Sequence, residues 1–146
     1  MEQIELKIPA TLEQVQLGAI AAANIAAAYY RIVTGTDPEK DNVYIDAVEL
    51  AVGEACTNSV KHCTKPYPED CRITVCFELY DGQLIVMIKD YNAPYDFDKV
   101  LPPDFDAAPE SGYGLYIIKQ TMDEVHYLHQ DGQNILTIKK SIVAGE

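Results

Sequence analysis

The sequence predicts an α+β domain in which helices cover one face of a mostly antiparallel sheet. Two pairs of segments rich in β-branched and aromatic residues are each joined by Asp-Gly, which is typical of hairpins. Two long stretches carry apolar residues at helical spacing. The elements follow the order β, α, α, β, β, loop, α, β, β. We therefore expect a two-layer α/β sandwich with a mixed, mostly antiparallel sheet, formed by a single domain over residues 1–146.

The first half of the chain predicts one strand and two helices. Residues 3–9 alternate apolar and polar side chains, as a half-buried strand does. Thr11 opens a plausible capping box for a helix over residues 12–33. An Asp-Pro pair then places an N-cap at Asp37 and predicts a second helix over residues 38–62.

The second half predicts two hairpins that flank a loop and a helix. Residues 71–90 form the first hairpin and residues 125–140 the second. Between them, residues 90–111 contain four prolines and a run of acids without apolar periodicity. Compact domains rarely keep a loop of about twenty residues without a functional reason. Helical spacing resumes after Gly112.

The composition is that of one soluble domain. The chain is 48% hydrophobic, which is enough for a single core at this length. Eleven basic and 23 acidic residues give a formal net charge of −12, which repels nucleic-acid phosphates and anionic lipid. No signal-peptide pattern is present, and the alanine-rich stretch over residues 17–30 is interrupted by Asn24 and predicted to be too short to cross a bilayer. We expect a cytoplasmic protein with no direct nucleic-acid or membrane contact.

The four cysteines are predicted to be reduced. Cys56, Cys63, Cys71 and Cys76 form no C-x-x-C pair, so the pattern favours neither a metal site nor a disulfide framework. Cys56 and Cys63 are seven positions apart, on the helical face that also carries Val48 and Val52 in this reading. We therefore expect the four cysteines to be buried free thiols in a reducing compartment.

A polar stripe runs along the second predicted helix. Glu54, Asn58 and His62 recur at every fourth position, away from the apolar sector. Ala47 and Ala51 are expected beside them, and such small residues leave room for a ligand to approach. The alternative is a stripe that is simply solvated.

Two further features add to the stripe. Asp90 ends a buried-looking strand, where a carboxylate can accept a hydrogen bond from the amine of adenine or can serve as an ordinary Asx-turn residue. Gly112 and Gly114 stand at a helix start, where free backbone amides suit a phosphate, although glycine also simply permits a tight turn.

Three motifs together resemble a known family. They read E-x-x-x-N-x-x-x-H over residues 54–62, D-x-N-x-P-Y-D over residues 90–96, and G-x-G-L-x-I-I-x-x-x-M-D-E-V over residues 112–125. In this order they resemble the anti-sigma factor serine/threonine-protein kinases of the histidine kinase-like, or GHKL, ATPase superfamily. The resemblance extends over nearly the whole chain in element order, and it implies a Bergerat-type ATP-binding fold.

The resemblance also implies a role for each matching residue. Glu54 would be the catalytic general base toward a serine or threonine hydroxyl, and Asn58 would ligate Mg²⁺. Asp90 would read the adenine amine, and residues 91–111 would form a lid over ATP. The implied nucleotide-binding set is Asn58, His62, Asp90, Asn92, Pro94, Gly112, Tyr113, Gly114, Leu115 and Asn134. His62 fits the end of this motif but equally fits a helix cap.

The chain departs from the family pattern at three places. Asn92 stands where glycine is usual, and asparagine tolerates a left-handed backbone. Asn134 stands where a threonine is frequent, and strand alternation puts it on the same face as two apolar residues. The lid carries a single lysine, Lys99, among five acids, whereas phosphoryl transfer normally uses positive charge beyond the metal. These acids are Asp96, Asp98, Asp104, Asp106 and Glu110.

Three functions follow as hypotheses. The first is an ATP-dependent kinase that sequesters a sigma factor and phosphorylates an anti-anti-sigma antagonist of the STAS type, with a homodimer expected and the first helix, including Arg31, as a candidate partner surface. The second is a catalytically weak or inactive, nucleotide-gated protein-binding module of the same fold. The third is an α+β domain without a nucleotide site.

Overall fold

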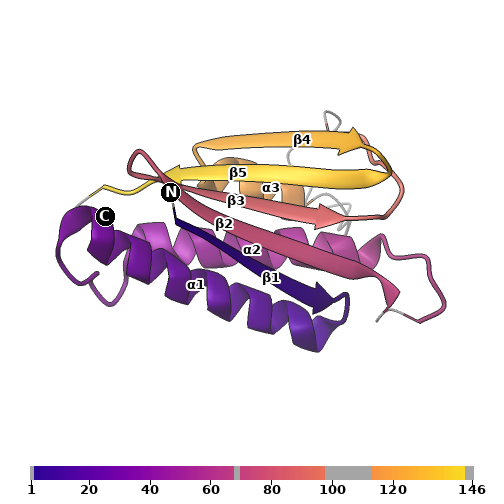
Figure 1. Cartoon of the computed structure of the whole chain (residues 1–146), viewed down its shortest axis with the longest axis horizontal. Helices are drawn as coiled ribbons and strands as arrows, with labels where there is room; N and C mark the ends of the chain where they lie inside the picture. The colour runs from indigo at the N-terminus through magenta and orange to yellow at the C-terminus, as the bar shows by residue number, and fades with distance from the viewer. Residues whose placement is uncertain (1, 68–69, 98–112, 144–146) are drawn as a thin grey trace, which may run out of the picture.

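The computed structural model describes residues 2–67, 70–97 and 113–143. They form a five-stranded sheet and three helices in the predicted order (Figure 1). The elements are β1 (Glu2–Pro9), α1 (Leu12–Thr34), α2 (Val43–Lys61), β2 (Arg72–Tyr80), β3 (Gln83–Asp90), α3 (Tyr113–Thr121), β4 (Glu124–Gln130) and β5 (Gln133–Ser141).

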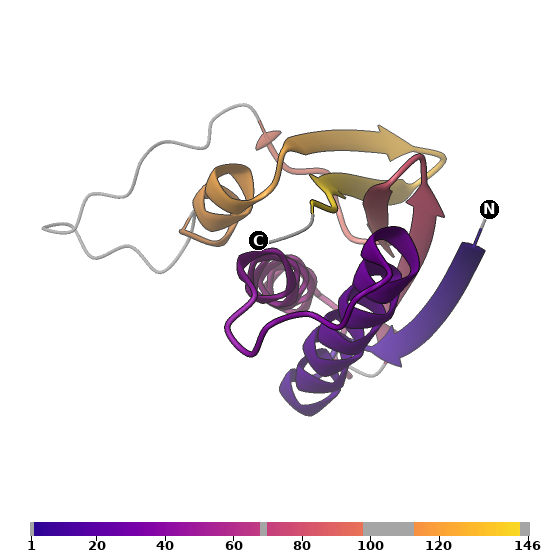
Figure 2. The same ribbon diagram turned by 90° about the vertical axis from the view of Figure 1, so that its left-hand side faces the viewer.

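The sheet has the strand order β1-β2-β3-β5-β4, and the helices lie on one of its faces (Figure 2). The predicted α+β sandwich is therefore confirmed. All four described strand pairs are antiparallel, whereas a mixed sheet was expected. Because two helices connect β1 to β2, the chain re-enters the sheet in the opposite direction and the two strands pair antiparallel.

The hydrophobic core lies between the sheet and the helices α1 and α2. Strands β3 and β5 bury alternate residues, because successive side chains of a strand point to opposite faces. Small residues let α1 approach closely: a Cβ on Gly18 would lie 3.3 Å from Cδ1 of Ile8. The fully buried side chains include Ala22, Ala26, Val48, Val52, Ile73, Val75, Phe77 and Ile138.

Both predicted hairpin turns are present. Asp81 and Gly82 have φ values of 52° and 72°, and Asp131 and Gly132 have 55° and 75°. Positive φ at both central residues is the requirement of a type I′ turn, which Asp-Gly meets at low cost. These turns fix the register of β2 on β3 and of β4 on β5.

The start of α2 differs from the prediction. The helix begins at Val43, and the N-cap is Asn42, whose Oδ1 accepts the N–H of Ile45 at 3.1 Å. Asp37 is instead paired with Arg31, with its Oδ1 2.6 Å from Nε. A buried asparagine cap explains the shift, since Asn42 satisfies a free helix donor while the Asp-Pro pair, with its exposed Asp37, stays in the connector. The cap of α1 is as predicted, with Thr11 Oγ1 accepting the N–H of Gln14 at 3.3 Å.

The prediction of four reduced cysteines is wrong for two of them. Cys63 and Cys71 form a disulfide that ties the end of α2 to the start of β2, with a Cα–Cα distance of 6.0 Å. Cys63 lies beyond the last residue of α2, so helical spacing does not apply to it. Cys56 and Cys76 are buried free thiols, and burial raises the pKa of Cys56 to about 12.

Helix α1 is longer than the alanine-rich stretch suggested. Its 23 residues make it, in the described part of the chain, the one helix long and apolar enough to cross a membrane by length and composition alone. The expectation that this segment is too short is therefore wrong. Core helices of soluble proteins pass the same test, and Ala22, Ala26, Tyr29 and Tyr30 of α1 are buried within the domain.

Candidate functional site

The polar stripe of α2 lies beside the start of α3. Glu54 and Asn58 are half-buried, and His62 is the exposed C-cap residue. A Cβ on Gly114 of α3 would lie 3.1 Å from Oε2 of Glu54 and 3.3 Å from Oδ1 of Asn58. The stripe is therefore not simply solvated, because the backbone of a second helix lies against it where a glycine leaves space.

The small residues beside the stripe are less open than expected. Ala51 is fully buried and Ala47 is half-buried. The physical reason is that α2 is covered by α1, by α3 and by the sheet. Of the two alanines, Ala47 stays partly exposed, as does the stripe from Glu54 onward.

Asp90 is the centre of a buried hydrogen-bond network. Its Oδ1 accepts the amide of Asn134 at 2.8 Å and the backbone N–H of Asn92 at 3.1 Å. Its Oδ2 accepts the hydroxyl of Ser59 at 2.6 Å. Strand pairing explains the first contact, since Asp90 and Asn134 are direct neighbours across β3 and β5. The carboxylate thus connects two strands and α2.

Asn134 points inward, as strand alternation predicts. It is buried, and its amide also donates to the carbonyls of Asn92 and Ala93 at 3.1 and 3.2 Å. Its Oδ1 accepts the hydroxyl of Tyr127 at 2.5 Å and lies 2.9 Å from Nδ1 of His129. Asn134 therefore holds the chain after β3 against β5.

Asn92 and Pro94 occupy the turn after β3. Asn92 does not have the left-handed backbone that a glycine substitute was expected to need. Its side chain instead donates to the carbonyl of Ser59 at 3.0 Å and so faces α2. Pro94 is exposed.

Asn58 and Asp90 line one cavity. The cavity measures about 10 Å³, the room of roughly one water molecule. Tyr95 fills the space beside it: its ring centroid lies 5.3 Å from that of His62 and 4.3 Å from that of Tyr127. Burial raises the pKa of Tyr95 well above its usual range. At this size the cavity has no room for a planar ligand, and the Tyr95 ring is one of its walls.

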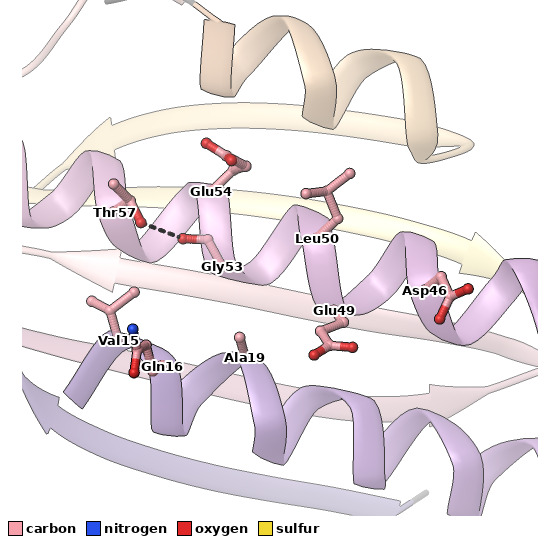
Figure 3. Close-up of a pocket in the computed structure, with 9 residues that line it drawn as sticks. All are labelled: Val15, Gln16, Ala19, Asp46, Glu49, Leu50, Gly53, Glu54 and Thr57. Atoms are coloured by element: carbon pink, nitrogen blue, oxygen red, sulfur yellow. Dashed lines mark hydrogen bonds between the residues drawn. The ribbon is translucent and has the colours of Figure 1, made fainter. Parts of the chain in front are cut away.

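A much larger groove of about 530 Å³ lies between α1 and α2 (Figure 3). Glu54 stands at its α3 side and points toward α3, whereas Glu49 points toward α1. Glu54 thus lines the edge of the groove with its carboxylate turned toward α3, and its neighbour one turn on, Asn58, lines the small cavity. The groove is lined by Val15, Gln16, Ala19, Asp46, Glu49, Leu50, Gly53, Glu54 and Thr57.

Of the remaining predicted site residues, some lie in the folded domain and others lie in residues 98–112, outside the described residues. Leu115 is buried in the core and anchors α3. Tyr113 is the first residue of α3. Gly112 and Lys99 lie outside the described residues, as do all the predicted lid acids except Asp96.

The described residues allow one mode of magnesium binding. They contain no group of three or more His, Cys, Asp or Glu side chains that could hold a metal. Magnesium, however, is commonly held by one or two protein oxygens together with substrate phosphates. The carboxamide oxygen of Asn58 faces the space that a Gly114 side chain would fill, so the residues fit a metal–nucleotide complex.

Sequence reasoning missed four residues of the site. Ser59 follows Asn58 directly, and its bond to Asp90 is visible only once α2 and β3 are placed together. Tyr95, Tyr127 and His129 come from separate segments, so no local pattern marks them as neighbours.

Comparisons with known proteins agree with this geometry. A family model for the histidine kinase-like ATPase domain matches residues 8–140. The chain belongs to this family. Proteins named serine-protein kinase RsbW from Bacillus cereus and Bacillus thuringiensis are each 35% identical to it over 147 residues, which cover 94% of this chain and 84% of theirs. The resemblance to anti-sigma factor serine kinases is thereby confirmed.

Solved structures support the histidine kinase-like fold. The RsbU and RsbW domains of a Mycobacterium tuberculosis protein match with a TM-score of 0.58 at 16% identity, over 97% of this chain and 33% of that one. The catalytic domain of the histidine kinase ThkA matches with a TM-score of 0.53 at 12% identity, over 97% of both chains. The expected Bergerat-type architecture is confirmed at the level of the fold.

Proposed function

We propose that this member of the histidine kinase-like ATPase family is an anti-sigma factor with ATP-dependent serine/threonine kinase activity. It sequesters a sigma factor and phosphorylates an anti-anti-sigma antagonist of the STAS type. One observation carries the proposal: Gly114 of α3 leaves space against Glu54 and Asn58 of α2, and Asn58 shares a cavity with Asp90. The names of the RsbW relatives support the class of reaction.

Each segment has a distinct task in this proposal. The Asn58 oxygen would hold Mg²⁺, and the first backbone amides of α3 would donate to phosphate oxygens, as free donors at a helix start do. The Asp90 carboxylate accepts three hydrogen bonds within the protein. Because two carboxylate oxygens offer about four acceptor sites, Asp90 can also accept from the amine of adenine.

Proton removal is the task of Glu54. When bound, Mg²⁺-ATP would supply the phosphoryl group, with ADP as the leaving group, and the positive charge of the metal. The Glu54 carboxylate receives the proton of the acceptor hydroxyl and orients that hydroxyl for attack. Glu54 does not line the small cavity beside Asp90, so an acceptor can reach this carboxylate without entering the proposed adenine cavity. In this proposal the Tyr95 ring moves out of the cavity when the adenine ring of ATP enters it.

Label transfer tests the kinase proposal. Wild type and Glu54→Ala are incubated with radiolabelled ATP and the antagonist encoded in the same cell, with Glu39→Ala as a control because Glu39 is exposed in the connector before α2. We expect label on the antagonist with wild type and Glu39→Ala but not with Glu54→Ala. Transfer that survives in Glu54→Ala removes the assigned role of this carboxylate.

A nucleotide-gated binding module is the second candidate. It is favoured by one observation: among the described residues, no lysine or arginine lines the groove or the small cavity. Calorimetry distinguishes the two. Tight Mg²⁺-ATP binding with no label on a confirmed native antagonist selects the module, and labelled antagonist selects the kinase.

The exposed face of α1 supports a protein contact, which we assign to a homodimer or a sigma partner of a cytoplasmic protein. Leu12, Leu17 and Ile20 are each more than half exposed, and large apolar side chains gathered on one helix often mark a protein contact. We expect a dimer by light scattering and a sigma subunit in a pull-down from the source cell. A monomer that captures no sigma subunit contradicts this part of the proposal.

A further inference from the structure

We infer that Cys63 and Cys71 form a reversible thiol–disulfide site, and that the disulfide form binds Mg²⁺-ATP more tightly than the dithiol form. The inference rests on the proposed nucleotide site and adds a regulation to it. The reaction partner of the site is a dithiol in the reducing direction and a peroxide in the oxidising direction.

The disulfide lies where three segments of the domain meet. The end of α2, the start of β2 and the end of β3 lie at the same end of the domain (Figure 1). Cys63 follows His62, the C-cap residue of α2, and Cys71 directly precedes β2. The backbone N–H of Ala10 donates to the carbonyl of Cys71 at 2.8 Å, which fixes Cys71 to the segment after β1. The disulfide therefore anchors the end of α2 to the sheet.

The last turn of α2 carries contacts that the proposed site needs. It contains Asn58, the proposed magnesium ligand, and Ser59, whose hydroxyl donates to Asp90 at 2.6 Å. The carbonyl of Ser59 accepts the side-chain amide of Asn92 at 3.0 Å. Helix ends open more readily than helix centres, because their last carbonyls lack partners within the helix. A covalent bond just beyond the helix therefore limits the motion of these side chains.

The sulfur pair is accessible to a reductant on the side of Cys63. Cys63 is half-buried, and residues 64–67 after it are exposed. Cys71 is buried and adjoins a pocket of about 180 Å³ whose charged lining residues are Lys65, Asp70 and Arg72. The Nζ of Lys65 is held there by the carbonyl of Asp70 at 3.1 Å. Two cations against one carboxylate leave positive charge beside Cys71, and positive charge stabilises the thiolate that leaves when a disulfide opens.

The exchange is balanced in atoms and electrons. A thiolate of the dithiol attacks Sγ of Cys63, the S–S bond breaks, and Cys71 leaves as a thiolate that takes up a proton. The second thiol of the reductant then displaces Cys63, so the chain gains two thiols and the reductant becomes a disulfide. In the other direction, two thiols and one hydrogen peroxide give the disulfide and two water molecules. In a cytoplasm, where thiols are kept reduced, a disulfide is usually transient or redox-sensing.

Redox state and nucleotide are coupled in both directions. Mg²⁺-ATP that binds the dithiol form has to order the end of α2, and this ordering lowers its affinity. Coupling between two sites typically changes affinity about 5- to 150-fold, and we expect the Kd for Mg²⁺-ATP to rise within this range on reduction. Linkage then requires Mg²⁺-ATP to oppose reduction by the same factor. A disulfide that only stabilises the fold would show neither effect.

Calorimetry on two forms of the full chain tests the inference. One sample is oxidised with a stoichiometric amount of hydrogen peroxide, and the other is reduced with dithiothreitol. Alkylation of the unfolded chains and mass spectrometry should count two free thiols, those of Cys56 and Cys76, in the first sample and four in the second. The Kd for Mg²⁺-ATP should be at least about fivefold higher in the reduced sample. Saturating Mg²⁺-ATP should raise, by the same factor, the ratio of reduced to oxidised dithiothreitol at which half of the chains are reduced.

Paired variants assign the effect to these two cysteines. Cys63→Ser with Cys71→Ser should bind Mg²⁺-ATP as reduced wild type does, whatever the dithiothreitol concentration. Cys76→Ala removes a thiol of β2 outside the pair and should keep the wild-type response. A count of four free thiols after oxidation overturns the inference. So does a loss of helical circular dichroism on reduction, because the bond then holds the whole fold together.

Mg²⁺-ATP binding by the two wild-type samples separates this inference from the kinase proposal. If both redox forms bind Mg²⁺-ATP with the same Kd, the redox inference fails and the proposed nucleotide site stands. If neither form binds it, both fail.

Discussion

Replacing Gly114 by alanine adds one methyl group at the point where α3 meets the stripe of α2. The new Cβ would lie 3.1 Å from Oε2 of Glu54, 3.3 Å from Oδ1 of Asn58 and 3.5 Å from its Nδ2. The first two distances are shorter than ordinary van der Waals contacts, so both side chains must shift by a few tenths of an ångström. The substitution thus disturbs the proposed base and the proposed metal ligand together.

The expected loss is large in activity and small in stability. Because misplacing a reacting group by about 1 Å can cost about 100-fold in rate, we expect kcat/KM to fall by about 10- to 100-fold. This corresponds to about 1.4 to 2.7 kcal/mol of transition-state stabilisation. The melting temperature of the nucleotide-free protein should stay the same or rise, since alanine favours a helix by up to about 1 kcal/mol over glycine.

Gly18→Ala is the matched control. It also adds a methyl group at a crowded helical glycine, 3.3 Å from Cδ1 of Ile8 and 3.8 Å from Sγ of Cys56, but against the buried face of α2 that is turned away from Glu54 and Asn58. Label transfer, Mg²⁺-ATP calorimetry and thermal melting are measured on wild type and both variants. Gly18→Ala should lower the melting temperature and keep the activity of its folded fraction. Equal transfer and equal nucleotide affinity in Gly114→Ala and wild type would refute the reasoning.

Three further predictions concern single residues of the site and core. Asp90→Asn should lower the free energy of unfolding without nucleotide by about 2–4 kcal/mol, because the donors of Ser59 and Asn134 lose a charged acceptor; chemical denaturation showing no change contradicts this. Tyr95→Ala should raise Mg²⁺-ATP affinity about 5- to 150-fold, since two ring contacts of about 0.5–1.5 kcal/mol each no longer need to be broken; weaker calorimetric binding would instead make the ring part of the bound site. The Cys56 thiol has a folded pKa of about 12 against 9.0 for the free group, so its contribution is complete below pH 9 and is lost as the pH rises toward 12. The free energy of unfolding should therefore fall by about 1.4 kcal/mol from pH 8 to pH 10, and Cys56→Ala should show a smaller fall.

Local signals in the sequence were sufficient for the order of elements. The Asp-Gly pairs at 81–82 and 131–132 demand positive φ at both positions, which few other dipeptides accept, so each hairpin could be located without tertiary information. Asn134 was predictable for a similar reason, because strand alternation fixed its face before its partners were known.

The features that the sequence did not predict depend on contacts between segments that are distant in the chain. The disulfide of Cys63 joins it to Cys71 only because β2 starts beside the end of α2. Asn42 outcompetes the Asp-Pro pair as a cap because it is buried, which the connector's composition does not reveal. The Asp90–Asn134 contact needs β5 beside β3, two strands that are not consecutive in the chain.

In the proposed site, α2, the end of β3 and the start of α3 bind one Mg²⁺-nucleotide complex. Backbone amide NMR spectra recorded during titration with Mg²⁺ and a non-hydrolysable ATP analogue examine all three segments in one experiment. We expect the signals of Asn58, Asp90 and Gly114 to change together and to fit one Kd. Changes at only one of the three positions, or separate Kd values for them, would contradict it.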